Sequence, residues 1–362
     1  MSVYSGPGLI NDGLVFYYDM DNTDKSWKGK PTTNLISSLG DPEAEYARGE
    51  FGQYFNLVDP FEQNGLVPYS LSFEAKGNIP GGIFVYMQNG SYTKYSFVGQ
   101  SINLSTEWQR FKFENITPSG PTAAWQTNTP GDNRAMLATY TGYGSGINPT
   151  LKNIQLELGS FATPFVASTR SNTQAILDLT GNNAVTASNL TYNSDNTFQA
   201  SGLDGSNISV TNIDLAQDFS LECWVYLNAL QGGFFGHGPT SSRQGLHITI
   251  GSNSTRFGMY ANDTDFAFPH QTGVWANYVF TYNHTTFVKK GYRNSVEYNG
   301  IPAQAQTSWI GSPGTLRIGQ NYGSYSGPSI NGIVSVAKMY NRVLTTDEVR
   351  QNFNAHRARY GI

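Results

Sequence analysis

Short segments in which apolar and polar residues alternate with period two recur along the whole chain. Clear examples are YSLSFEAKG at 69–77, FSLECWVYL at 219–227 and GIVSVAKMYN at 332–341, each bounded by Gly, Pro or Asn. Alternation places successive side chains on opposite faces of a strand, as in a half-buried sheet. The turn signals between these segments come at the spacing of β-sandwiches rather than of βαβ units. We therefore expect an all-β fold built from β-sandwich (jelly-roll) domains.

One helix is expected, at the C-terminal end. Within NRVLTTDEVRQNFNAHRARYGI at 341–362, Thr345 stands three positions before Glu348. This spacing predicts a capping box, in which the two side chains satisfy backbone N–H groups at the start of the helix. Val349 and Phe353 are four residues apart, so we expect them to lie on one face of the helix and to dock it on a sheet.

Length and composition limit the class of protein. The 362 residues are enough for two domains of ordinary size, each with a sizeable core. The formal net charge of −4 provides no basic surface for phosphates, so binding to nucleic acid or to an anionic membrane is not expected. The single cysteine, Cys223, excludes a disulfide framework and is expected to be a buried strand residue. The first residues lack the pattern of a secretory signal, and no segment has the apolar length of a membrane helix.

The C-terminal segment 332–362 resembles the last strand and closing helix of laminin-G-like, concanavalin A-type lectin/glucanase domains, as they occur in virion proteins of tailed phages. In such domains the first strand reads like NDGLVFYYDMDN, which is found here at 11–22, and a turn like DLTGNN soon follows. In this chain the turn arrives only in LDLTGNNAVTASNLTYN at 177–193. The resemblance therefore implies a lectin-like sandwich that is interrupted after its first strand.

The interrupting segment resembles a second kind of domain. It contains TTNLISS from residue 32, STEWQRFKFENI at 105–116 and LKNIQLELGSFATPFVASTRS at 151–171, which look like parts of a carbohydrate-binding-module jelly roll. Insertion of one domain into another is tolerated at a surface loop whose ends lie close together. The expected domains are residues 1–31 as the first strand of the lectin-like sandwich, 32–168 as the inserted jelly roll, and 169–362 as the remainder of the sandwich with its C-terminal helix.

The sequence shows no carboxylate pattern for glycoside hydrolysis. An enzyme of the laminarinase type needs an acid and a nucleophile on one strand, in a spacing like E-x-D-x-x-E, and no such run occurs. The nearest candidates are Glu43 with Glu45, Glu157 alone, and Asp263 with Asp265. Solvated strand faces produce such pairs routinely, so we expect a protein that is not an enzyme. The alternative is a phage polysaccharide depolymerase or glucanase whose carboxylates converge from separate strands.

Calcium is the one cofactor that the resemblance implies, because lectin-like sandwiches and binding-module jelly rolls often hold a structural Ca²⁺ in their loops. The acidic stretch from Asp19 does not fit an EF-hand, since the loop positions that require Gly and Glu hold Asp24 and Lys30. Two other places stay open as calcium sites. Their candidate ligands are Glu43, Glu45 and Glu157 in the jelly roll, or Asp263 and Asp265 in the lectin-like sandwich.

Aromatic residues in loops are the candidates for sugar binding, because pyranose rings stack on aromatic faces while Asn, Asp or Arg bind the hydroxyl groups. Three loop sequences fit this description: TAAWQTNTPGDNR at 122–134, TYTGYGSG at 139–146 and GQNYGSYSGPS at 319–329. The alternative is that these loops are ordinary turns or subunit contacts. The candidate glycan-binding residues are Trp125, Tyr140, Tyr143, Asn321, Tyr322 and Tyr325.

The resemblance and the missing catalytic run lead to one expected function. We expect a structural and binding protein on the surface of a tailed-phage virion, assembled in the host cytoplasm, as a capsid decoration or a fibre-like appendage. Its partners would be host glycans or neighbouring virion subunits. Self-association as a homo-oligomer, a trimer, is expected by analogy with such appendages and not from any residue. The alternatives are the depolymerase above and a tail receptor-binding adhesin.

Overall fold

The computed structural model describes residues 8–36, 46–47, 53–56, 64–78, 83–88, 96–118, 134–140, 149–192, 198–202, 205–321 and 329–362. Antiparallel strands joined by turns make up most of these residues, and the α-helix α3 (Thr346–His356) lies near the C-terminal end. The predicted all-β class with a short C-terminal helix is confirmed. Among the described residues, the helices are too short or too polar to cross a bilayer.

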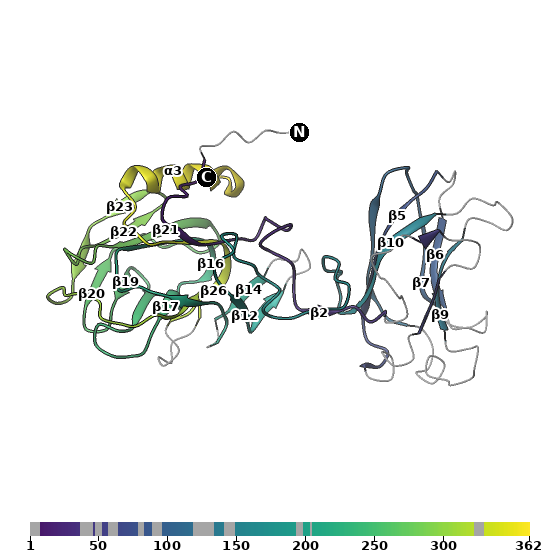
Figure 1. The fold of residues 1–362 in the computed structure, drawn as a ribbon, viewed down its shortest axis with the longest axis horizontal. Helices are drawn as coiled ribbons and strands as arrows, with labels where there is room; N and C mark the ends of the chain where they lie inside the picture. Colours follow the sequence, from purple (N-terminus) through teal and green to yellow (C-terminus); the bar gives the residue numbers. More distant parts are fainter. Residues whose placement is uncertain are drawn as a thin grey trace. The chain divides into compact units, whose positions relative to one another are not determined.

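The chain divides into two compact units. Unit 1 consists of residues 1–30 and 172–362, and unit 2 consists of residues 31–171. Many of the strands of each unit are labelled in Figure 1. One continuous segment therefore separates the first strand of unit 1 from all its other strands.

The two segments that connect the units run antiparallel beside each other. In unit 1, Trp27 forms a β-bridge with Ile176. In unit 2, β2 (Thr32–Thr33) pairs with β11 (Thr169–Arg170). The ends of the inserted segment thus lie together, which is the arrangement that lets a host domain close around an insertion.

Unit 2 contains two four-stranded antiparallel sheets. The first has the order β3 (Tyr46–Ala47), β10 (Thr150–Leu158), β5 (Tyr69–Lys76) and β8 (Gln109–Ile116). The second has the order β4 (Gln53–Asn56), β9 (Arg134–Tyr140), β6 (Ile83–Gln88) and β7 (Ser96–Ile102). The buried face of the first sheet carries Leu71, Phe73 and Phe113, as the alternation in these strands predicts.

Unit 1 is a sandwich of two eight-stranded sheets. The helix-side sheet has the order β13 (Leu190–Tyr192), β14 (Phe198–Ser201), β26 (Asn331–Tyr340), β16 (Phe219–Ala229), β21 (Trp275–Tyr282), β22 (Lys289–Arg293) and β23 (Val296–Tyr298), with β1 (Leu14–Asp19) also paired to β26. The far sheet has the order β12 (Val185–Ser188), β15 (Asn207–Ile213), β25 (Gly314–Ile318), β17 (Gly233–His237), β18 (Leu246–Ile250), β19 (Thr255–Gly258), β20 (Asp263–Phe266) and β24 (Gly300–Pro302). The core lies between the sheets and includes Cys223, which is buried as predicted.

The helix α3 covers the outer face of the helix-side sheet (Figure 1). The ring of Phe353 stacks on Trp224 of β16 at 5.5 Å, and Tyr360 stacks on the same indole at 4.3 Å. Thr345 and Glu348 form the predicted capping box at the start of the helix. The expected docking face is confirmed, because Val349 and Phe353 are both buried.

The strand β1 completes the helix-side sheet by pairing with β26 from its first residue to its last. Beside this pair, Arg359 donates to both carboxylate oxygens of Asp19, over 2.8 and 3.1 Å, and its Nε lies 2.9 Å from Asp21. Burial acts to raise the pKa of Asp19, but the hydrogen bonds from Arg359 bring it below its usual value. The acidic stretch near the start of the chain therefore binds an arginine from the other end.

A fully buried ion pair lies under α3. Glu222 on β16 is opposite Lys338 on β26, and the Lys338 Nζ lies 3.1 Å from Glu222 Oε1. Asn277 and Asn352 donate to the same carboxylate over 3.2 and 2.9 Å. Burial lowers the pKa of Lys338, although the Glu222 carboxylate opposes this effect. The Glu222 carboxylate thus receives donors from three other elements where the helix excludes water, while the side-chain oxygen of Asn277 is buried without a hydrogen-bond partner.

Glu222→Gln is expected to destabilise unit 1 by about 3–5 kcal/mol, because it leaves the Lys338 ammonium buried without a carboxylate. Urea unfolding of the full chain, followed by tryptophan fluorescence, measures the change. Asp347→Asn is the matched control, since Asp347 pairs with Arg350 on the solvent side of α3 and should contribute under about 1 kcal/mol. Equal effects of the two substitutions would contradict the buried role of Glu222.

Candidate functional site

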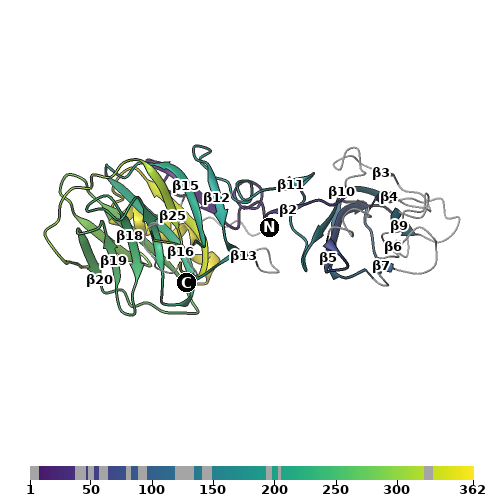
Figure 2. The same cartoon turned by 90° about the horizontal axis from the view of Figure 1, so that it is seen from below.

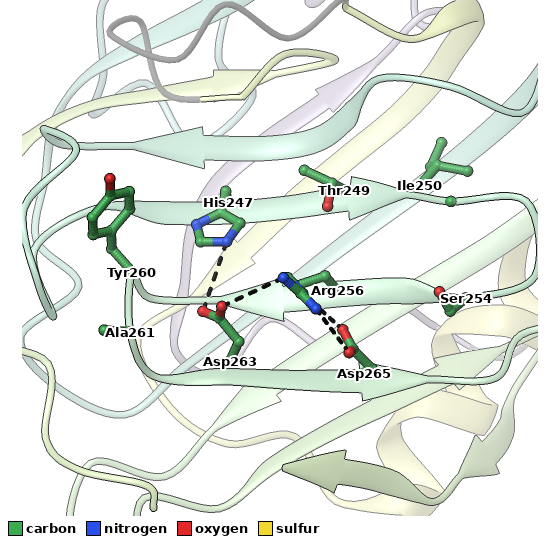
Figure 3. Close-up of a pocket in the computed structure, with 10 residues that line it drawn as sticks. His247, Thr249, Ile250, Ser254, Arg256, Tyr260, Ala261, Asp263 and Asp265 are labelled. Atoms are coloured by element: carbon green, nitrogen blue, oxygen red, sulfur yellow. Dashed lines mark hydrogen bonds and ion pairs between the residues drawn. The ribbon is translucent and has the colours of Figure 1, made fainter. Parts of the chain in front are cut away.

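A cavity of about 460 Å³ opens on the outer face of the far sheet. It lies over β18, β19 and β20 and beside the turn that joins β19 to β20 (Figure 3). Its polar side chains come from three neighbouring strands and the two turns that join them: His247, Thr249, Ser254, Arg256, Tyr260, Asp263 and Asp265.

The alternation of these strands explains why polar residues gather on this face. In β18 the side chains of Leu246 and Ile248 enter the core, so His247 and Thr249 point outward. The next two strands follow the same rule: Phe257 and Phe266 are core residues, and the alternate positions face the cavity. The register then aligns Thr249 with Arg256 and Arg256 with Asp265 across the three strands.

Arg256 stands between the two aspartates (Figure 3). Its Nε and Nη2 donate to the two oxygens of Asp265 over 2.9 and 3.0 Å, and its Nη1 lies 3.8 Å from Asp263 Oδ2. The Asp265 pair has the bidentate geometry that a guanidinium and a carboxylate prefer. The cavity therefore presents one fixed cation flanked by two fixed carboxylates.

Gly258 allows His247 and Asp263 to approach each other across the middle strand. The register places Gly258 between them. A Cβ atom at this glycine would collide with the His247 imidazole and lie 2.7 Å from Asp263 Oδ1. The ring therefore fills the space above the glycine, with its Nε2 3.7 Å from Asp263 Oδ1.

One oxygen of Asp263 is an unsatisfied acceptor. Burial lowers the pKa of His247, and the Asp263 charge only partly opposes this, so the imidazole is neutral near pH 7. The 3.7 Å separation is too long for a hydrogen bond. Within the described residues, Asp263 Oδ1 is buried and has no hydrogen-bond donor. Such an acceptor is uncommon in a folded protein and favours a ligand or water that supplies a donor.

The turn beside the cavity exposes an aromatic ring. Tyr260 and Ala261 occupy its two central positions with φ angles of 49° and 61°, and Met259 N donates to Asn262 O over 3.1 Å to close it. Positive φ angles at both positions match the twist of a two-residue hairpin, but side chains other than Gly, Asn or Asp are uncommon there. The turn holds Tyr260, which is 38% exposed, at the edge of the cavity and edge-on to His247.

A buried lysine anchors the start of β20 from inside the sandwich. Lys289 on β22 donates to the backbone and side-chain oxygens of Asn262 over 2.7 and 3.2 Å, and also to Gln306. Burial lowers the pKa of Lys289 to about 7, although the charge of Asp263 opposes this. The residue next to Asp263 is thereby fixed to the opposite sheet, which keeps the cavity wall in place.

Comparison with known families identifies the domain that carries this cavity. Residues 200–350 match the family model described as the concanavalin A-like lectin/glucanases superfamily. The matched range contains every residue that lines the cavity. Unit 1 contains a concanavalin A-like lectin/glucanase domain. Because the superfamily includes both lectins and glucanases, the match alone does not decide between binding and hydrolysis.

Solved structures similar to this chain include three of different origin. Domain 4 of an extracellular arabinanase from Geobacillus stearothermophilus, solved with arabinotriose, is 17% identical, with 51% of this chain and 93% of that chain covered and a TM-score of 0.39. The ligand-binding domain of botulinum neurotoxin serotype D, solved with N-acetylneuraminic acid, is 14% identical, with 51% and 49% covered and a TM-score of 0.39. A Trypanosoma rangeli sialidase is 14% identical, with 52% and 32% covered and a TM-score of 0.41.

The alignments span about half of the neurotoxin domain and a third of the sialidase. Identities and TM-scores this low transfer no ligand to this chain. No curated protein matches its sequence.

The lectin-like domain brings together two of the residues proposed from the sequence. Asp263 and Asp265 lie on one face of β20 and both line the cavity. As a pair of calcium ligands they fit poorly, because Arg256 already neutralises them and would repel a divalent cation. No group of three or more His, Cys, Asp or Glu side chains suited to a metal occurs in the part of the chain that the structure describes.

Glu157, the other described calcium candidate, is a buried residue on β10 of unit 2. Its carboxylate accepts hydrogen bonds from Thr32 Oγ1 (2.7 Å), Gln155 Nε2 (2.7 Å) and Thr163 N (2.7 Å). Thr163 Oγ1 adds a fourth at 2.8 Å. Four donors occupy the lone pairs that a cation would need, so the carboxylate serves to join the two ends of unit 2. Its expected partners Glu43 and Glu45 lie outside the described residues.

Most of the predicted glycan-binding residues lie outside the described part of the chain, or have side chains that are not described. Trp125, Tyr143, Tyr322 and Tyr325 lie outside the described residues, and Tyr140 is described only as the last backbone position of β9. Asn321 is buried, at 3% exposure, and its side chain packs against Gly233. This differs from the exposed loop position that the prediction required, because the backbone of the neighbouring strand end lies over it.

Sequence reasoning missed His247, Arg256 and Tyr260. The alternation in GLHITIG and RFGMYAND predicts which residues of each strand face away from the core, and His247 and Arg256 are among them. Which strands become neighbours could not be read, because β18, β19 and β20 could equally have paired with other strands of similar pattern.

Gly258→Ala is expected to destabilise the lectin-like domain by about 1–3 kcal/mol, since the added methyl group displaces His247. In a His247→Ala background, where the space above the strand is empty, the same change should cost under about 1 kcal/mol. Urea unfolding of the four proteins in this double-mutant cycle gives both values. Identical costs in the two backgrounds would show that His247 does not occupy the space over Gly258.

Proposed function

We propose that this chain is a non-enzymatic glycan-binding protein and that the cavity on the far sheet binds the sugar. The observation that carries the proposal is the set of fixed polar groups in one cavity with an exposed aromatic ring at its edge. Sugar hydroxyls both donate and accept hydrogen bonds. Asp263 and Asp265 supply acceptors, Arg256 supplies donors, and Tyr260 supplies a face for stacking.

The size and rigidity of the cavity support binding. Its volume of about 460 Å³ falls within the range of small-ligand sites. The polar groups are held by the strand register, by the Arg256–Asp265 pair and by Lys289 beneath Asn262. Groups that are already positioned lose little conformational entropy when a ligand binds.

The position of Arg256 argues against hydrolysis at this cavity. Glycoside hydrolysis generally needs a proton-donating carboxyl group and a second carboxylate on either side of the scissile bond. Here the guanidinium stands between the two aspartates, in the space that such a bond would require. An arrangement of acceptor, donor and acceptor suits the recognition of hydroxyl groups instead.

The proposed setting is the surface of a tailed-phage virion, where the chain would act as a homo-oligomeric decoration or appendage in contact with other virion proteins. The resemblance of residues 332–362 to domains of virion proteins supports this setting. Antibodies raised against the chain are expected to label intact particles in electron micrographs, on the capsid or on the tail. Labelling of the free chain but not of intact particles would overturn the proposed setting.

Asp263→Asn and Arg256→Gln are each expected to weaken glycan binding by about tenfold or more, since each removes a charged hydrogen-bonding partner. A printed array of defined oligosaccharides and host-surface polysaccharides identifies the sugars bound by the full chain, and titration calorimetry measures affinity. Asp347→Asn and Arg350→Gln on α3 are the matched controls and should bind like the unmodified chain.

A reducing-sugar assay on the same polysaccharides tests the non-enzymatic part of the proposal, and no release is expected. Turnover that is abolished by Asp263→Asn or by Glu157→Gln would make the chain an enzyme. Failure of the full chain to bind any sugar on the array would overturn the glycan-binding function itself.

A further inference from the structure

The polar face of the cavity continues across the far sheet as one aligned row. From β20 inward, the register pairs Asp263 with Gly258, Gly258 with His247, and His247 with Gly236. It then pairs Gly236 with Arg317 on β25, and Arg317 with Ser209 on β15. We call these residues the polar row: Asp263, Gly258, His247, Gly236, Arg317 and Ser209. Figure 2 shows the labelled strands β18, β19, β20, β25 and β15 of this sheet.

Glycine alternates with a polar side chain along the polar row. Gly258 stands between Asp263 and His247, and Gly236 stands between His247 and Arg317. These glycines add no side chain of their own: the His247 ring occupies the space above Gly258, and Gly236 is buried, so the polar groups lie close together along the row. With about 4.8 Å between neighbouring strands, the row from Asp263 to Arg317 extends roughly 19 Å. This length exceeds one sugar ring and suits a short chain of rings that crosses the strands.

A second cavity, of about 560 Å³, lies at the Arg317 end. Its wall includes Gly238, Gln244, Thr315 and Arg317. The same loop that carries Gln244 also contacts the first cavity, because Arg243 N donates to Tyr260 O over 2.9 Å. One loop therefore borders both cavities, and the polar row passes from one to the other.

The two arginines on this face differ in their charge balance. Arg256 is neutralised by Asp265 and Asp263. Within the part of the chain that the structure describes, the Arg317 guanidinium makes no hydrogen bond and no ion pair, and the residues that line its cavity include no carboxylate. A guanidinium beside a polar cavity without a counter-ion favours an anionic group on a ligand, since carboxylate and sulfate oxygens match its planar donors.

We propose that the two cavities form one extended site for an acidic oligosaccharide, whose anionic group pairs with Arg317 while its neighbouring rings bind over His247 and at Asp263. This inference rests on the proposed glycan-binding function and specifies its ligand class. The anion is a carboxylate or a sulfate ester, because both present planar or forked oxygens to a guanidinium. Neutral rings of the same chain occupy the first cavity, where Arg256 has no free charge to offer.

The test compares matched acidic and neutral oligosaccharides on the full chain. The array carries oligogalacturonates beside their methyl esters, and sulfated oligosaccharides beside their desulfated forms, so that the members of each pair share one sugar chain and differ in the anionic group. The acidic member of at least one pair is expected to bind about tenfold more tightly than its neutral counterpart. Preference within the ester pairs identifies a carboxylate ligand, and preference within the sulfated pairs identifies a sulfate ligand.

Arg317→Gln is expected to remove this preference and to leave binding of the neutral forms unchanged. Arg317→Lys keeps the positive charge and should retain a reduced preference for acidic over neutral oligosaccharides. It replaces Arg317→Gln as the test if the glutamine variant folds poorly. Arg350→Gln, an exposed arginine on α3, is the matched control and should keep the full preference. A higher salt concentration should weaken binding of the acidic oligosaccharides more than binding of the neutral ones.

The outcomes separate this inference from the function on which it rests. In one outcome, the full chain binds glycans and Asp263→Asn weakens that binding, but acidic and neutral forms bind alike and Arg317→Gln has no effect. The proposed acidic site is then wrong, and the glycan-binding function stands. If the full chain binds no member of any pair, the proposed function fails and the extended site fails with it.

Discussion

The pairing of β1 with β26 is the interaction on which unit 1 depends. One side of β26 is shared by two partners: β14 pairs with its first residues, and β1 pairs with residues 336–340. Without β1, that length of edge would have no partner, and the core would lose Phe16 and Tyr18, which are both fully buried. Arg359, next to the end of the chain, then holds Asp19 at the end of β1. The first strand of the lectin-like domain is thus held both by the last strand, β26, and by an arginine that follows the helix α3.

The outer faces of the two sheets differ in whether their polar groups are covered or exposed to water. On the helix-side sheet, outward positions carry Trp224 and the Glu222–Lys338 pair, which need the cover of α3 to be shielded or satisfied. On the far sheet, outward positions carry Arg256 and Asp265, which balance each other while they remain partly exposed to water. This difference in cover explains why the polar cavity lies on the far sheet, where polar groups are fixed but still accessible.

Features with a local cause could be predicted from the sequence. The strands follow from alternation, and the helix start follows from Thr345 and Glu348, because capping involves residues within one turn. The aspartates of the site were found as an i, i+2 pair, but Arg256 was not, because its role depends on the pairing of β19 with β20. Asn321 looked like an exposed loop residue and is buried, since nothing in its neighbourhood in sequence reveals that Gly233 leaves room for its side chain. Contacts between distant segments therefore set the limit of prediction.

The insertion after β1 also fixes an order of events during synthesis. Residues 31–171 form a continuous unit, so all its strands have left the ribosome while most of unit 1 is still untranslated. The strand β1 emerges first but finds its partner β26 only when residues 331–340 have been made. Throughout that interval a strand rich in Phe and Tyr has an unpaired edge, which is the condition under which chains associate wrongly. Once β2 pairs with β11, the outgoing and returning segments lie together, so the rest of the lectin-like domain is made from a point beside the segment that follows β1.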